Sequence, residues 1–226
     1  MLMLVFALPE EARAVRRRIR WLRRMHANAR ETGSVDGGRR GFLAGHLVSL
    51  SFVGIGGAHI DQVEREVDLV KPQLIISSGF AGATRSLLEP GDFVLSANYT
   101  DRAIGKLLIR HKIVDANGAF VQVKQVASVA DKWSLNRTAG SAAVDMESEI
   151  IADLCRRKQL SMVTGRMISD AISETIPSIF VGGKISSLKD LSDAAVFAAR
   201  MLRLTGRLAD RLETLVGTLG STAGTK

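Results

Sequence analysis

Apolar residues occur along the first part of this chain with the periods of strands and helices. Residues 1–8 form a continuous apolar run, which is typical of a strand buried on both faces of a sheet. Pro9-Glu10-Glu11 then places a proline and two acids where a helix begins. Next, Val15, Ile19 and Leu22 recur at helical spacing, so we expect the strand to lead straight into a helix.

The following segments repeat this alternation. Residues 31–41 are rich in glycine and predict a hairpin-like connection into one or two strands over residues 43–53. Apolar residues at i, i+3, i+7 and i+10 predict an amphipathic helix over residues 60–70. Residues 73–78 predict another strand, which we expect to end in a turn at Gly79-Phe80-Ala81-Gly82. This order predicts a largely parallel sheet covered by helices.

The second half of the chain continues the pattern less regularly, and residues 99–117 receive no assigned element. We expect strands over residues 92–97, 120–128, 142–145 and 161–168, and helices over 131–137 and 146–158. Residues 191–212 predict one long C-terminal helix or two, and residues 217–226 predict a flexible tail. The sequence shows no internal repeat or linker, so we expect a single domain over residues 1–216.

The composition favours a globular protein. The 226 residues are 46% hydrophobic, with a mean hydropathy of +0.12, which allows a substantial core. The longest apolar runs fall short of the roughly 18–20 residues that a membrane-spanning helix needs. Because no basic segment precedes the N-terminal apolar run, the start of the chain is unlike a signal peptide, and we expect a cytoplasmic location.

Cysteine and histidine usage argues against a disulfide and a metal centre. Cys155 is the only cysteine, and it falls in an apolar helical pattern, which favours a buried structural thiol over a nucleophile. The four histidines are scattered without the spacing of metal ligands. We therefore expect neither a metal ion nor another cofactor.

Much of the net charge of +8 lies in one stretch. The arginines of this stretch are Arg13, Arg16, Arg17, Arg18, Arg20, Arg23 and Arg24. Such a charge can attract nucleic acid, an anionic membrane or a phosphorylated substrate. The chain has only 5% aromatic residues and no recognisable nucleic-acid-binding module, so a solvated helix face is favoured and we expect no nucleic-acid partner.

Three acidic residues follow predicted strands. Glu11 follows the first strand, Glu147 follows residues 142–145, and Asp170 follows residues 161–168. Open α/β sheets bind ligands at the carboxyl ends of their strands, so these carboxylates can form one site if the strands are neighbours. Each also has a structural explanation, since an acid at a helix N-terminus can cap the helix or complement its dipole.

Six segments, taken in order, resemble those of the nucleoside phosphorylase superfamily. They are Pro9-Glu10-Glu11, Val53-Gly54-Ile55-Gly56, Ser78-Gly79-Phe80-Ala81-Gly82, Glu89-Pro90-Gly91-Asp92, Ala143-Val144-Asp145-Met146-Glu147-Ser148 and Arg166-Met167-Ile168-Ser169-Asp170. Within the superfamily the chain is most similar to methylthioadenosine/S-adenosylhomocysteine nucleosidases and to short relatives associated with hopanoid synthesis. The resemblance implies a three-layer αβα sandwich around a mixed, largely parallel sheet, and a homodimer that binds a small-molecule nucleoside.

The resemblance also implies roles for individual residues. Asp170 would protonate nitrogen-7 of the departing purine, which requires it to hold a proton at neutral pH. Glu11 would orient or deprotonate the attacking water. Glu147 would accept hydrogen bonds from the ribose hydroxyls, and Met146 would pack under the sugar. Further substrate contacts are implied for Leu8, Ile55, Phe80, Ala81, Gly82 and Ser169.

Two departures from the phosphorylases favour hydrolysis over phosphorolysis. Those enzymes commonly carry a phosphate-gripping arginine where this chain has Ser77, and their glycine-rich phosphate loop is replaced here by Leu8-Pro9-Glu10-Glu11. A phosphate dianion needs cationic partners and would be repelled by Glu11. Other arginines, such as Arg85, could still supply charge. The expected activity is hydrolysis of a purine nucleoside, such as a 5′-substituted adenosine or an adenosyl-lipid.

Three hypotheses remain open at the sequence level: a purine nucleoside hydrolase, a phosphate-dependent phosphorylase, and a non-catalytic nucleoside-binding protein on the same fold. Phe80 stands where the nucleosidases have serine, and the segment from Asp101 to Arg137, which includes their base-holding loop, is shorter. The sequence therefore leaves the base and the 5′-group unassigned. For an adenosyl-lipid substrate, the arginine-rich helix could lie against an anionic membrane surface.

Overall fold

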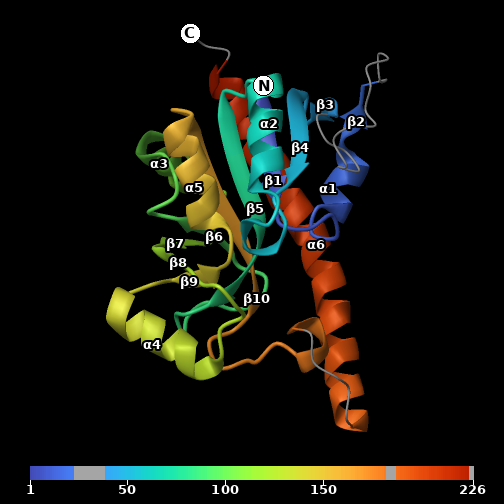
Figure 1. The fold of residues 1–226 in the computed structure, drawn as a ribbon, viewed down its shortest axis with the longest axis vertical. Coiled ribbons are helices and arrows are strands. Elements are labelled where there is room, and N and C mark those ends of the chain that lie inside the picture. The colour runs from blue at the N-terminus through green and yellow to red at the C-terminus, as the bar shows by residue number, and fades with distance from the viewer. Residues whose placement is uncertain (23–38, 182–186, 224–226) are drawn as a thin grey trace.

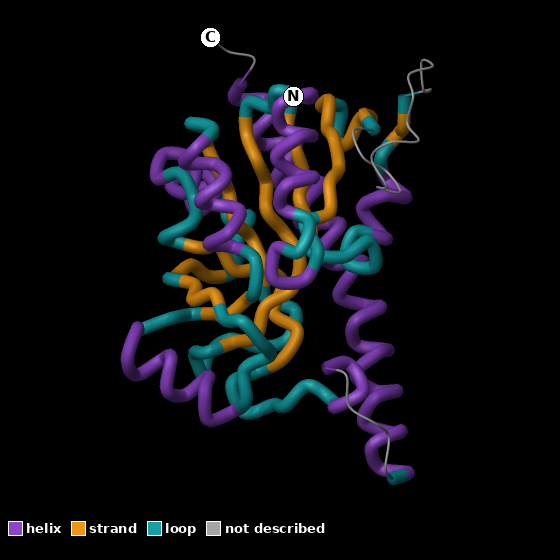
Figure 2. Tube along the Cα trace, in the orientation of Figure 1, coloured by secondary structure: helices purple, strands orange, loops and turns teal. Residues whose placement is uncertain are grey.

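The computed structural model describes residues 1–22, 39–181 and 187–223, which form a mixed sheet between layers of helices (Figures 1 and 2). In spatial order the strands are β2 (Arg20–Trp21), β3 (Arg40–Leu43), β4 (His46–Phe52), β1 (Leu2–Phe6), β5 (Leu74–Ala83), β10 (Ser161–Asp170), β6 (Phe93–Ser96) and β7 (Ala116–Gly118). Two further strands, β8 (Phe120–Gln122) and β9 (Ala143–Asp145), pair with each other, and β9 also pairs with β5. The central strands β4, β1, β5 and β10 are parallel, so their carboxyl ends lie at one edge.

Helices cover both faces of this sheet, as the alternation of buried side chains in β1 requires. The helices are α1 (Arg13–Arg18), α2 (Ile60–Val70), α3 (Arg102–Arg110), α4 (Val129–Ala139), α5 (Ser148–Arg157) and α6 (Leu188–Ala223), with short 3-10 turns η1 (Ile55–Gly57) and η2 (Ser178–Val181). Leu2, Leu4 and Phe6 join one core with α1, α3 and α6. Met3 and Val5 join a second core with α2 and α5. The expected three-layer αβα sandwich is therefore confirmed.

The arginine-rich helix is shorter than its apolar pattern predicts. Helix α1 ends at Arg18, because residues 20–21 pair with β3 as strand β2. Val15 and Ile19 are buried as predicted, whereas Leu22 is 46% exposed. The predicted buried stripe is thus right at Val15 and Ile19 and wrong at Leu22. Beyond Ile19 the backbone forms hydrogen bonds with β3 and not within a helix.

The end of α1 is tied to the C-terminal helix by charge. Arg18 donates hydrogen bonds to Asp210 and Glu213 of α6. Part of the positive charge of the stretch is therefore neutralised within the molecule. Arg23, Arg24 and residues 31–38 of the predicted connection lie outside the described residues.

The predicted turn at residues 79–82 is wrong. Strand β5 continues to Ala83, and Phe80 and Ala81 lie opposite Met167 and Ile168 of β10. The glycines suggested a turn, but the equally long strand β10 offers backbone partners along the whole segment. As a result, both strands reach into the region where the predicted site residues lie.

The C-terminal region forms one helix that extends beyond the sheet in Figure 1. This helix continues past Gly217 to Ala223, and Leu219 packs in the core at 5% exposure. The prediction of a flexible tail is therefore wrong over residues 217–223, because Leu219, about one turn beyond Val216, still packs in the core. Residues 99–117, which received no predicted element, contain α3 and β7.

Cys155 is buried, as its sequence context predicts, and burial raises the pKa of its thiol to about 12. The described residues contain no group of three or more histidine, cysteine or acidic side chains arranged to hold a metal ion. Within those same ranges, no helix is both long and apolar enough to cross a membrane.

Candidate active site

The three acids predicted from the sequence lie near the carboxyl edge of the central sheet. Glu11 follows β1 and Asp170 is the last residue of β10, and both strands are parallel neighbours of β5. Glu147 follows β9, which pairs with the end of β5. This is the edge at which open α/β sheets bind ligands.

Glu11 is held by backbone donors from the segment just after β1 and from β5. Its Oε2 accepts hydrogen bonds from the backbone N–H groups of Ala7 (3.0 Å) and Leu8 (3.1 Å). Its Oε1 accepts one from Phe80, at 3.4 Å. Burial raises the pKa of Glu11 to about 7, against the opposing effects of these hydrogen bonds and of the Arg166 charge. A carboxyl group with this pKa can change its protonation near neutral pH.

Gly79 makes this approach of Glu11 to β5 possible. The φ angle of Gly79 is +145°, and a Cβ at this position would lie 3.0 Å from Oε1 of Glu11. Any larger residue would push the carboxylate away from the Phe80 N–H. Gly79 of the segment that resembles the superfamily is therefore needed within a strand, where it leaves room for the Glu11 carboxylate, and not in the turn that the sequence pattern predicted.

Glu147 is held in place by the turn after β4. Its Oε1 accepts a hydrogen bond from the backbone N–H of Gly56, at 3.0 Å, and the residue is 7% exposed. Burial raises the pKa of Glu147, while the Arg166 charge lowers it. Two predicted contact residues flank this bond, because Ile55 precedes Gly56 and Met146 precedes Glu147. Ile55 is 55% exposed and Met146 is partly buried, so both can meet a ligand.

Arg166 links the two glutamates electrostatically. It is 2% exposed, and its Nε and Nη2 donate to Asp145 and Ser77, each at 3.0 Å. Its positive charge favours the ionised forms of both Glu11 and Glu147. Its Nη1 has no hydrogen-bond partner among the described residues. A buried donor of this kind can bind a water molecule or an oxygen of a ligand.

Ser77, the residue that replaces the phosphorylase arginine, does not face a ligand. It is fully buried, and its hydroxyl accepts a hydrogen bond from Arg166. Arg85 lies apart from the glutamates and donates to the carbonyl groups of Asn117 and Gly140. Neither residue is therefore placed to grip a phosphate beside Glu11.

Asp170 lies in a separate, buried part of the same edge. Its Oδ2 forms an ion pair with Nζ of Lys132, and its Oδ1 lies 2.5 Å from the hydroxyl of Ser169. A Cβ at Gly82 would lie 3.1 Å from Oδ2, so this glycine leaves room for the carboxylate. Gly79 and Gly82 mark the two halves of the site, about 10 Å apart along β5 at about 3.3 Å per residue.

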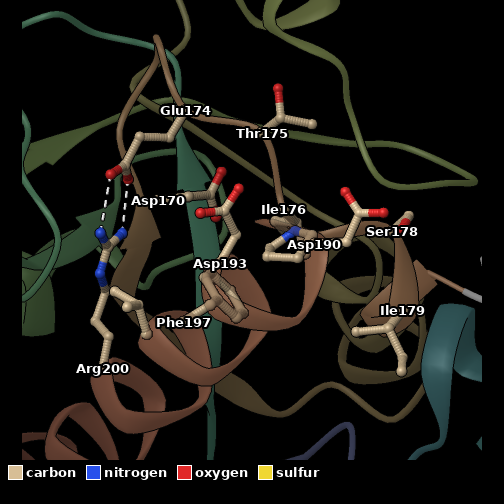
Figure 3. Close-up of a pocket in the computed structure, with 12 residues that line it drawn as sticks. Asp170, Glu174, Thr175, Ile176, Ser178, Ile179, Asp190, Asp193, Phe197 and Arg200 are labelled. Carbon is tan, nitrogen blue, oxygen red and sulfur yellow. Dashed lines mark hydrogen bonds and ion pairs between the residues drawn. The ribbon is translucent and has the colours of Figure 1, made fainter. Parts of the chain in front are cut away.

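Asp170 borders a cavity of about 460 Å³ between the segment after β10 and the first turns of α6 (Figure 3). Figure 3 shows the ion pair between Glu174 and Arg200 at one side of this cavity. Apolar side chains of Ile176 and Phe197 also line it. The cavity thus offers apolar surface and charged groups next to the predicted proton donor.

The remaining predicted contact residues differ in what they can offer a ligand. Leu8 and Phe80 are partly exposed, and each donates its backbone N–H to Glu11. The side chain of Ala81 packs in a core, and its carbonyl accepts a hydrogen bond from Ser169. Ala81 can therefore contact a ligand only through its backbone.

Two charged residues of the site were not predicted from the sequence. Arg166 belongs to a motif of the superfamily, and an arginine inside an apolar strand is itself a signal, because a buried charge needs partners. Lys132 has no such signal, since it lies in a polar helix whose sequence shows no apolar face. Only the folded chain brings it to Asp170.

Comparison with protein families gives one match. The model of the phosphorylase superfamily matches residues 2–127. No curated protein matches the chain.

Solved structures match over nearly the whole chain. A candidate 5′-methylthioadenosine/S-adenosylhomocysteine nucleosidase from Borrelia burgdorferi B31, bound to adenine, is 16% identical with a TM-score of 0.74, covering 96% of this chain and 99% of that one. The nucleosidase from S. pneumoniae with the transition-state inhibitor MT-ImmA is 17% identical, with a TM-score of 0.72 and coverage of 96% and 99%. The futalosine hydrolase of Helicobacter pylori strain 26695 is 16% identical, with a TM-score of 0.67 and coverage of 95% and 96%. At these identities the similarity establishes the fold.

Proposed function

Since this chain belongs to the phosphorylase superfamily, whose model matches residues 2–127 of its 226, we propose that it hydrolyses the N-glycosidic bond of a purine nucleoside. The observation that carries the proposal is the carboxyl group of Glu11, with a pKa of about 7, fixed at the carboxyl edge of the sheet. A base with this pKa is well matched to activating water near neutral pH. The charges of Glu147 and Arg166 both act on Glu11, and Nη1 of Arg166 has no hydrogen-bond partner among the described residues. These groups support a site for water and ribose oxygens.

Asp170 acts at the other end of the site in this proposal. Cleavage leaves electrons on the purine, and protonation of nitrogen-7 neutralises them, so the departing base needs an acid beside it. Asp170 borders a cavity whose apolar side chains, Ile176 and Phe197, suit a planar base. Glu147 accepts hydrogen bonds from the ribose hydroxyls between the two ends.

The acidic surroundings of Glu11 support water as the nucleophile. A phosphate dianion would meet Glu11 and Glu147 with Arg166 as the counter-charge, and Arg166 already binds Asp145. Repulsion from the carboxylates therefore disfavours phosphorolysis.

The substrate in this proposal is an adenosine with a 5′-substituent, by analogy with the adenine and inhibitor bound in the similar structures. We further propose that the protein is a homodimer. Leu191 and Leu202, which lie on one side of α6, are more than half exposed, and a second copy would cover these apolar side chains.

The test incubates the protein with methylthioadenosine, adenosine and inosine, in the presence and absence of phosphate. Chromatography then measures the adenine or hypoxanthine released. We expect free base and a free sugar at equal rates in both conditions. Cleavage that depends strictly on phosphate, with a sugar 1-phosphate as product, would contradict hydrolysis. Binding of these nucleosides without cleavage would support a non-catalytic protein instead.

A further inference from the structure

The ion pair between Asp170 and Lys132 carries an inference that rests on the proposed function and deepens it. The two side chains are each 2% exposed. Lys132 comes from α4, which projects to one side of the sheet in Figure 1, and it is the only buried residue of residues 129–139. A lysine as the single buried residue of a helix is costly unless its ammonium group has close acceptors, so the contact with Asp170 is a specific feature of this site.

The hydrogen-bond donors of Lys132 are all committed. Its Nζ donates to Oδ2 of Asp170, to the carbonyl of Ala171 (2.9 Å) and to the carbonyl of Glu174 (2.8 Å). An ammonium group has three N–H donors, so these three acceptors use every hydrogen it has. Oδ2 of Asp170 therefore already accepts a hydrogen bond from Lys132. A proton on this carboxyl group would be carried by the other oxygen.

The other carboxylate oxygen, Oδ1, has room for a proton. The hydroxyl of Ser169 lies 2.5 Å from Oδ1 and 3.2 Å from the carbonyl oxygen of Ala81. A hydroxyl has a single hydrogen, which can serve only one of these contacts. The network around Asp170 thus has five contacts and four hydrogens, three from Lys132 and one from Ser169. A proton on Oδ1 completes it.

We infer that Lys132 is a positioning residue for the leaving-group acid: by holding Oδ2 of Asp170, it directs the transferable proton to Oδ1. When the purine is bound, the proton on Oδ1 turns from the Ser169 hydroxyl to nitrogen-7, and it passes to that nitrogen as the glycosidic C–N bond breaks and its electron pair moves into the base. Asp170 is left as a carboxylate, which the ammonium of Lys132 stabilises. Solvent water returns the proton to Oδ1 after the base has left.

Other charged groups lie near this pair. Arg200 of α6 donates to the carbonyl of Ser169 and forms an ion pair with Glu174. Asp190 and Asp193, also on α6, line the cavity that Asp170 borders. Lys132 is the cation that directly contacts the Asp170 carboxylate. A substitution that removes the charge of Lys132 therefore affects Asp170 more than it affects the other charged groups nearby.

The test measures kcat and KM between pH 5 and 9 for the wild type, Lys132→Met and Lys132→Arg, with the best nucleoside substrate. Lys132→Met should lower kcat by about 10-fold or more while KM changes less than about 3-fold. It should also move the alkaline limb of the pH profile up by about one pH unit or more, because the carboxylate has lost its cation. Lys132→Arg keeps the charge, so its alkaline limb should stay at the wild-type position.

Asn136→Ala is the matched control in α4. It removes a different hydrogen bond of this helix, from Nδ2 to the carbonyl of Ser141, and should leave kcat and the pH profile unchanged. Thermal unfolding of each variant reports whether α4 still packs. Should Lys132→Met fail to fold, Lys132→Gln keeps an N–H donor without the charge, and its alkaline limb should still move upward.

Two results separate the possible failures. An active wild type with the same kcat and pH profile in Lys132→Met overturns the role of Lys132 alone. The same loss of kcat in Lys132→Met and Lys132→Arg, with neither limb moved, also overturns it, because that pattern indicates packing. A wild type that cleaves no nucleoside overturns the proposed function, and this inference with it.

Discussion

Each carboxylate of the site is held by a specific set of hydrogen-bond donors. Glu11 receives three backbone N–H groups, and Glu147 receives the N–H of Gly56. Asp170 receives the ammonium of Lys132. Backbone donors leave the charge of Glu11 largely unneutralised, so burial wins and its pKa rises to about 7. The carboxylates at the two ends of the site are therefore held by different donors, backbone N–H groups at Glu11 and an ammonium at Asp170.

Asp170→Asn tests the proton donor at the residue scale. Asparagine keeps the shape of the side chain but has no acidic proton, so turnover should fall by about 100-fold or more. Initial rates of adenine release from the best substrate measure this loss. Asp153→Asn, an exposed residue of α5 paired with Arg156, is the control and should keep wild-type turnover. Normal turnover in Asp170→Asn would rule out Asp170 as the proton donor.

At the scale of elements, strand pairing and helix packing decide where each predicted element ends. Strand β5 continues through its glycines because β10 pairs with it, and α1 ends early because β2 pairs with β3. Helix α6 continues past Gly217 because its apolar positions still meet the core at Leu219. In each case a contact from a distant part of the sequence overrides the local signal.

Leu219→Ala tests whether the end of α6 is part of the folded core. Leu219 is 5% exposed, so the substitution should lower the free energy of unfolding by about 2–5 kcal/mol. Leu202→Ala is the control within the same helix, since Leu202 is 64% exposed and should lose less than about 0.5 kcal/mol. Urea denaturation at equilibrium measures both. Equal values for the two variants would contradict a packed helix over residues 217–223.

At the scale of the whole molecule, the cost of burying Glu11 appears in the stability of the fold. Its pKa is about 7 in the folded protein, against 4.5 for a free side chain, so the folded state binds this proton more tightly than the unfolded state. The resulting stability is fully present below about pH 4.5 and is lost as the pH rises through about 7. Above pH 7 the side chain of Glu11 is ionised in the folded protein, and this charge lowers the stability of the fold.

Glu11→Gln should therefore gain stability relative to the wild type as the pH rises from 5 to 8. We expect the difference in the free energy of unfolding to grow by about 1–3 kcal/mol, below the full effect of the pKa shift because Glu11 is partly accessible. Denaturation curves at several pH values measure it. Glu64→Gln, on the surface of α2, should show no such growth, because ion pairs with Arg157 and Lys158 lower the pKa of Glu64. A constant difference for Glu11→Gln would contradict the raised pKa.

The sequence by itself determined the alternation of strands and helices and the position of Glu11, Glu147 and Asp170 at strand ends, because hydrophobic period is visible within a few residues. The sandwich fold was implied by the order of the six segments that resemble the phosphorylase superfamily. The tertiary structure alone decided which partners each acid has. Lys132 lies 38 residues before Asp170, and no period or motif in the sequence marks it. Periodicity shows that a side chain is buried, whereas only the packed chain shows which charge lies beside it, and that charge sets the chemistry of the site.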